Sequence, residues 1–131
     1  MERRILNPWS WQDGFGFVQA NEIRGAQRIL ICSGQASINA DGRVAHPGDM
    51  LAQTRQAFDN LETVLQQAGL TLADVVRLNY YTTDVDRFLE AYQGVKDRLH
   101  DAGCRPASTL LGIARLAYPE LLIEIEATAV G

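Results

Sequence analysis

The most constraining feature of this chain is a stretch near its middle in which core-type residues recur at helical spacing. These residues are Leu51, Thr54, Phe58, Leu61, Val64, Leu65 and Ala68. A spacing of three or four residues places them on one face of an α-helix. Pro47 precedes the helix, and Gly69 stands where a C′ residue is expected. An amphipathic helix of this kind must bury its apolar face against a second layer of structure.

Segments on both sides of this helix supply that layer. Asn39 to Arg43 reads as a turn, and Asp84 is a good N-cap for a second helix that ends near Gly103. Runs rich in apolar, β-branched and aromatic residues predict strands at 14–20, 28–34, 75–82, 108–116 and 121–128. The order is two strands, helix, strand, helix and two strands, which predicts an α+β fold with two helices on one face of a mixed sheet.

The other face of this sheet needs a cover as well. Leu110, Ile113 and their neighbours make it too apolar for a monomer, so the residues alone predict some form of oligomer.

Composition excludes several classes of protein. The chain has 131 residues, 47% of them hydrophobic, and a net charge of −4 without any run of Lys or Arg. We therefore expect one domain and no nucleic-acid partner, because phosphate binding needs clustered positive charge. No segment approaches the length of a membrane span, so we expect no membrane partner and a cytoplasmic location. Cys32 and Cys104 match no metal-ligand spacing, and we expect two free thiols, no metal and no cofactor, with Cys32 buried as a small hydrophobe.

Several short motifs point to one family. They are Cys32-Ser33-Gly34-Gln35, the stretch 53–61, Arg105-Pro106-Ala107-Ser108-Thr109, Ala114-Arg115-Leu116 and Ile123-Glu124-Ile125-Glu126-Ala127. Together they resemble the Rid family (YjgF/YER057c/UK114), typified by RidA, over nearly the whole chain. The resemblance implies one Rid-like domain over residues 1–131 with a chorismate-mutase-like fold of the Bacillus type. It also implies a homotrimer with ligand clefts between subunits.

The resemblance further implies an enamine or imine deaminase site for a small-molecule ligand. By this correspondence Glu124 positions the attacking water, and Ser33 lines the cleft. The other three family positions differ here: Ser108 replaces an Arg that binds the substrate carboxylate, Phe17 replaces a Tyr, and Tyr92 replaces an Asn. A guanidinium offers a carboxylate a bidentate contact that a serine hydroxyl does not, so these differences predict a changed substrate class.

Each candidate also has a purely structural interpretation. Glu124 fits a solvated carboxylate on an alternating strand, and Ser33 fits an ordinary turn residue. Ser108 fits either a small residue at a strand start or a weaker hydrogen-bonding substitute that favours a neutral or differently placed ligand group, and a nucleophilic role is the least favoured. Arg105 is either a relocated anchor for the substrate or an exposed loop charge, and the latter is favoured.

Two groups of aromatic residues leave alternatives open. The rings of Trp9, Trp11, Phe15 and Phe17 either cap the cleft or pack the N-terminal segment onto the domain. Tyr80 and Tyr81 face opposite sides of their strand, and the sequence leaves open which of them reaches a cleft.

Two functions follow as hypotheses. The first is a hydrolase that acts on a small, reactive enamine or imine-type metabolite, and the retention of Glu124 favours it. The second is a non-catalytic trimer that binds a small molecule or serves a regulatory role, favoured by Phe17 and Ser108. An endoribonuclease is disfavoured by the acidic charge and by the lack of a recognisable His/Lys arrangement.

Overall fold

The computed structural model describes residues 1–131 and contains two sheets and three α-helices. The strands are β1 (Glu2–Leu6), β2 (Ala20–Arg24), β3 (Ile29–Ile31), β4 (Gln35–Ala36), β5 (Val75–Thr82), β6 (Ala107–Gly112) and β7 (Ile123–Val130). The helices are α1 (Met50–Gln67), α2 (Val85–Glu90) and α3 (Tyr92–Asp101), with a 3₁₀ turn, η1, at Leu72–Asp74.

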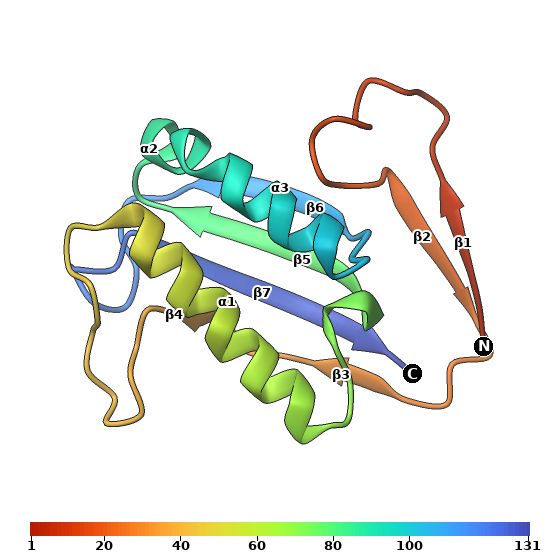
Figure 1. Ribbon diagram of the computed structural model, residues 1–131, viewed down its shortest axis with the longest axis horizontal. Helices are drawn as coiled ribbons and strands as arrows, with labels where there is room; N and C mark the ends of the chain where they lie inside the picture. Colours follow the sequence, from red (N-terminus) through yellow and green to blue (C-terminus); the bar gives the residue numbers. More distant parts are fainter.

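The larger sheet has five strands with β7 at its centre. Strand β7 pairs antiparallel with β3, β4 and β5, and β6 pairs parallel with β5. Figure 1 shows all three helices on the same side of this sheet. The α+β prediction is confirmed, and the fold matches the chorismate-mutase-like one implied by the resemblance. The predicted second helix is two helices, because the helical run is interrupted at Ala91.

Helix α1 confirms the strongest sequence pattern, except that Leu51, predicted on the buried face, is 40% exposed. Asp49 accepts a hydrogen bond from the backbone N–H of Ala52, which satisfies one of the free donors at the N-terminus. Phe58, Leu61 and Leu65 on its inner face are at most 1% exposed. No helix in the structure has the length and apolar character that a membrane crossing requires.

Alternate residues of β5 and β7 supply the sheet's side of the core. Leu78 and Tyr80 on β5, and Ile123 and Ile125 on β7, point toward the helices and are at most 2% exposed. Cys32 and Cys104 are both free thiols, as predicted. Both are buried, which was predicted for Cys32 alone. Burial raises the pKa of the Cys104 thiol to about 12, so this thiol stays neutral at physiological pH.

The N-terminal region differs from the prediction. The strand expected at 14–20 is wrong: residues 11–16 form turns, and β1 and β2 pair in a separate two-stranded sheet that stands at one end of the molecule in Figure 1. The fully buried Gln12 holds this turn region, because its amide donates to the Trp9 carbonyl and accepts from Gln19. Aromatic residues there suggested a strand, but the side-chain hydrogen bonds and the positive φ of Gly16 (76°) favour a compact loop.

The β1–β2 hairpin is attached to the main sheet by side chains. Arg3 donates to the carbonyls of Ala73, Val75 and Arg105, and Asn21 donates to the carbonyl of Val76. These contacts place the N-terminal segment beside the start of β6.

Strand β6 differs from the prediction in where it ends and in which of its residues face the uncovered side of the sheet. Strand β6 ends at Gly112 instead of residue 116. Leu110 pairs with Tyr80 and packs against the core, so it lies on the helix side of the sheet. The apolar residues of the uncovered face are instead Ile29 (65% exposed), Ile31 (80%) and Leu111 (48%).

Candidate functional site

The uncovered face of the sheet carries a group of hydrogen-bonded polar residues at its centre. Glu124 and Glu126 alternate with the buried Ile123, Ile125 and Ala127 of β7 and therefore lie on this face. Tyr81 donates to Oε1 of Glu126 at 2.8 Å, and the amide of Asn79 donates to the same oxygen at 3.2 Å. The carboxylate of Glu126 is thus fixed by two donors from the neighbouring strand.

Glu124 occupies the position beside this group. It is the direct partner of Tyr81 in the β5–β7 register, and its side chain lies against Gly34. A Cβ atom on residue 34 would lie 2.6 Å from Cδ of Glu124, so only glycine leaves room for the carboxyl group as it stands. Burial raises the pKa of Glu124, and the nearby charge of Glu126 raises it further. A half-buried carboxylate with a raised pKa is a suitable general base.

Ser33 immediately precedes the glycine that contacts Glu124. It is exposed, and its carbonyl accepts a hydrogen bond from the Gln35 side chain. The close approach of Gly34 therefore brings the segment of Ser33 to the same part of the uncovered face as Glu124.

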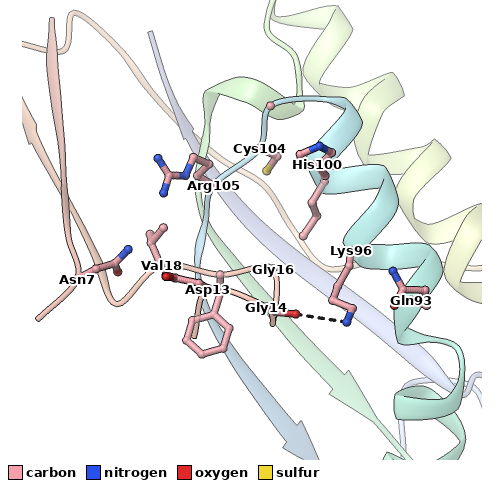
Figure 2. Close-up of a pocket in the computed structure, with 13 residues that line it drawn as sticks. Asn7, Asp13, Gly14, Gly16, Val18, Gln93, Lys96, His100, Cys104 and Arg105 are labelled. Carbon is pink, nitrogen blue, oxygen red and sulfur yellow. Dashed lines mark hydrogen bonds between the residues drawn. The ribbon is translucent and has the colours of Figure 1, made fainter. Parts of the chain in front are cut away.

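Phe17 and Arg105 lie elsewhere, on a cavity of about 710 Å³ between the N-terminal segment, α3 and the connection to β6. Neither Ser33 nor Glu124 lines this cavity. Arg105 is exposed, and its guanidinium has no hydrogen-bond or ion-pair partner. Figure 2 shows this arginine on the chain that leads into β6, across the cavity from α3.

Tyr92 belongs to the helix layer above this cavity. Its hydroxyl donates to the Phe15 carbonyl at 2.7 Å, and its ring packs against Tyr80 and Phe88. The ring therefore fills space between helix and sheet, and its only polar atom is already used to hold the N-terminal segment.

Ser108 is half-buried and lies on the helix side of the edge strand β6. It is the register partner of the fully buried Leu78 in β5 and so points to the helix side. Its hydroxyl oxygen is buried without any hydrogen-bond partner.

The six predicted site residues thus fall into two groups. Ser33 and Glu124 share the uncovered face, whereas Phe17, Tyr92, Arg105 and Ser108 belong to the helix side and the β6 edge. Within one chain the structure does not bring the two groups together.

The structure adds residues to both groups that sequence reasoning missed. Tyr81 and Glu126 join Glu124, and Lys96 and His100 join Arg105 on the cavity. The alternation of residues in β5 and β7 would have identified Tyr81 and Glu126 only if the pairing register of these two strands had been known. The spacing of Lys96 and His100, four residues apart on one helix, was visible in the sequence.

Comparisons with known proteins agree with this fold. A family model described as Endoribonuclease L-PSP matches residues 15–131. The crystal structure of YyfB from Yersinia pestis, described as a protein of unknown function of the conserved Rid family, shares 39% identity. It has a TM-score of 0.88, and 99% of each chain is covered.

Two proteins with curated descriptions are similar over most of their length. A RutC family protein of Aquifex aeolicus is 32% identical over 87% of both chains. The 2-iminobutanoate/2-iminopropanoate deaminase of Escherichia coli is 35% identical, over 78% of this chain and 79% of that protein. With a family model that covers most of the chain and relatives above 30% identity, this chain belongs to the Rid (YjgF/YER057c/UK114) family.

Proposed function

We propose that this protein is a deaminase-like hydrolase that acts in the cytoplasm on a small, reactive enamine or imine, with Glu124 positioning the attacking water. The environment of Glu124 carries this proposal. The carboxyl group is half-buried, lies against Gly34 and has a raised pKa, and Glu126 beside it is held by Tyr81 and Asn79. The name of the Escherichia coli relative supplies the class of reaction.

The proposed reaction requires few catalytic groups. Addition of water to a C=N bond needs a water held near the carbon and a group that accepts its proton. Glu124 accepts that proton as the water oxygen adds to the carbon of the protonated C=N bond, which an enamine forms by taking up a proton from solvent at its carbon. The neutral carbinolamine then loses ammonia when its nitrogen is protonated, and its hydroxyl proton passes to solvent to give the carbonyl product. Protonated Glu124 returns the proton to the leaving nitrogen, and its raised pKa makes the carboxylate a better proton acceptor in the first step.

We expect the cleft to form between subunits of a homotrimer. The two groups of candidate residues lie apart within one chain, and Ile29, Ile31 and Leu111 are exposed around Glu124's face of the sheet. Association over this face would cover the apolar residues and would bring Glu124 and Ser33 toward the other group on a neighbouring chain. A monomer mass in light scattering would contradict the shared cleft.

We also expect the substrate to differ from those named for the Escherichia coli relative. The hydroxyl of Ser108 is buried without a partner, and the hydroxyl of Tyr92 already donates to the Phe15 carbonyl, so neither residue offers a substrate carboxylate the charged contact of an arginine. We expect slow turnover of 2-iminobutanoate for this reason.

The test is a paired assay of Glu124→Gln and a matched control, Glu90→Gln, at an exposed position on α2. Imines generated in situ by an amino-acid oxidase would serve as the substrate panel. For any imine that the wild type turns over, Glu124→Gln should lose about 10²- to 10⁴-fold, the range typical of a general base, and Glu90→Gln should lose nothing. Full activity in Glu124→Gln would remove the proposed base.

The second candidate is a trimer that binds a small molecule without catalysis. Phe17 and Ser108 favour it, because both differ from the ligand-binding residues implied by the family resemblance. Absence of turnover over the whole panel, together with saturable ligand binding, would support this second function.

A further inference from the structure

The loop between β1 and β2 carries both tryptophans of the chain on its surface. Trp9 is 60% exposed and Trp11 is 58% exposed, although indole side chains are highly buried on average. Figure 1 shows this loop at one end of the molecule. Exposure of this extent does not fit simple packing of the N-terminal segment onto the domain, and the proposed function uses neither indole.

The two indoles line an open groove with a volume of about 700 Å³, within the range of roughly 300–1,000 Å³ for small-molecule sites. We call it the indole groove, and its lining residues are Asn7, Pro8, Trp9, Ser10, Trp11 and Asp13. Asp13 is the only ionisable residue among them. It also borders the neighbouring cavity, but the cations there, Lys96 and Arg105, form no ion pair with it. The indole groove is therefore aromatic and negatively charged.

A fully buried side chain holds the acidic end of the groove in place. The amide of Gln12, which is 0% exposed, donates to the Trp9 carbonyl at 2.8 Å and to Oδ1 of Asp13 at 2.9 Å. The oxygen of the same amide accepts from Gln19 at 3.0 Å. The backbone N–H of Asp13 donates to the Ser10 carbonyl at 3.1 Å, which closes the turn. The carboxylate of Asp13 is thus positioned beside the tryptophans without any ligand.

The two indoles differ in how they are supported. The ring of Trp11 meets that of Phe17 edge to face, with centroids 5.8 Å apart and planes at 69°. Trp9 has no aromatic partner within stacking distance. Trp11 therefore offers a pre-positioned ring, and the ring of Trp9 is free to pack on a ligand.

The face of an indole carries a negative potential that attracts cations, and the carboxylate of Asp13 adds a full negative charge. We propose that the indole groove binds a small organic cation with a fully methylated nitrogen, which contacts the rings of Trp9 and Trp11 and lies beside Asp13. A quaternary ammonium fits better than a primary one, because the groove is open to water and a primary ammonium is strongly hydrated. The proposal goes beyond the proposed function, since it requires neither Glu124 nor a second chain.

The experiment is a titration of the purified protein with choline at constant ionic strength, followed by tryptophan fluorescence. The chain contains two tryptophans, and both line the groove, so the emission reports on this site alone. Dimethylbutanol, the alcohol in which a carbon atom replaces the nitrogen of choline, is the neutral isostere. Choline should change the emission saturably, with a dissociation constant on the order of 1–10 mM, and dimethylbutanol should bind at least about tenfold more weakly.

Two variants test the residues of the groove. Trp9→Leu removes one ring and leaves the emission of Trp11 as the signal, and it should weaken choline binding by about threefold to tenfold. Asp13→Asn removes the charge but keeps an oxygen that accepts from Gln12, so the loop should retain its structure. It should weaken choline binding to a similar extent, by about threefold to tenfold.

Matched controls come from outside the groove. Asp41→Asn removes the same charge from an exposed turn, and Tyr118→Leu removes an aromatic ring that is 46% exposed. Both should leave choline binding unchanged, as should Glu124→Gln. The last variant separates this proposal from the proposed function, since loss of turnover with intact choline binding affects only the latter.

Several results would overturn the proposal. They are the absence of saturation with choline at about 50 mM, equal binding of dimethylbutanol, and unchanged affinity in the folded Trp9→Leu and Asp13→Asn variants. A blue-shifted emission, typical of buried indoles, in the protein without choline would also overturn it, because a second copy of the chain would then cover the groove.

Discussion

The two faces of the five-stranded sheet are made of alternate residues of the same strands, and they have little else in common. Tyr80 and Tyr81 show the difference. Tyr80 is 2% exposed and packs its ring 5.3 Å from that of Phe88, whereas Tyr81 points to the other side and donates to Glu126. Two adjacent residues of one type therefore serve stability on one face and the candidate site on the other.

The contrast extends to neighbouring residues. The helix face is a continuous core in which Ile123, Ile125 and Phe88 are fully buried. The uncovered face has Glu124 and Glu126 at its centre and the exposed Ile29 and Ile31 beside them. We expect substitutions on the helix face to lower the free energy of unfolding. Substitutions on the uncovered face should instead alter catalysis or assembly.

The largest effect is expected for Phe88→Ala. Removal of this buried ring leaves a cavity against Tyr80 and Tyr92 and should lower the free energy of unfolding by about 3–5 kcal/mol. Leu111→Ala on the uncovered face is the comparison and should cost far less in a monomer, because Leu111 is 48% exposed. Urea denaturation measures both. A similar cost for the two variants would show that the uncovered face is itself buried in an assembly.

Gly34→Ala is expected to separate chemistry from stability. The new Cβ would meet the flexible Glu124 side chain, which can rotate away at a cost below about 1 kcal/mol to folding. Because the carboxyl group then leaves its position, turnover should fall by about tenfold or more. Gly94→Ala on α3 is a suitable control, since the added methyl group has room there. Equal activity of the two variants would mean that the contact with Gly34 does not position Glu124.

A smaller effect should appear in the pH dependence of stability. Burial and Glu126 raise the pKa of Glu124, so ionisation of Glu124 costs the folded state more than the unfolded one. Its stabilising contribution is therefore complete below the ordinary glutamate pKa of about 4.3 and is lost as the pH rises through the raised value. Glu124→Gln should melt at a higher temperature than the wild type at pH 7, and this gain should shrink at pH 4.

Glu126→Gln refines the same measurement. It removes the nearby negative charge and should lower the pKa of Glu124, as followed by carboxyl NMR titration. An unchanged titration of Glu124 would leave burial as the sole cause of the shift.

The smallest effect is expected for Ser108→Ala. The hydroxyl of Ser108 is buried without a partner, so its removal should leave the free energy of unfolding unchanged or slightly raised. Urea denaturation measures this change. A marked loss of stability would show that the hydroxyl of Ser108 has a partner, such as a bound water.

Much of the fold could be predicted from local patterns. The α1 helix, strand β5 at 75–82 and the Asp84 cap followed directly from periodicity and capping residues. The N-terminal strand could not be predicted, because the turn region depends on Gln12, Gln19 and Asn7, whose hydrogen bonds join residues 3 to 12 positions apart.

The candidate site was likewise only partly predictable from the sequence. The motifs identified the family and singled out Glu124, Ser33 and Arg105, since each stands in a short stretch that can be compared directly. They did not reveal that the hydroxyl of Ser108 is buried on the helix side of β6 or that Arg105 shares a cavity with Lys96.

The sequence by itself therefore determined the secondary elements, the α+β class and the family, because periodicity and short motifs are local properties. Tertiary structure alone decided which of Tyr80 and Tyr81 accompanies Glu124, and which face of the sheet carries Leu110. Those answers depend on the pairing register of β5, β6 and β7, and a shift of one residue would exchange the two faces. Register is set by contacts between segments far apart in the chain, and no local pattern contains it.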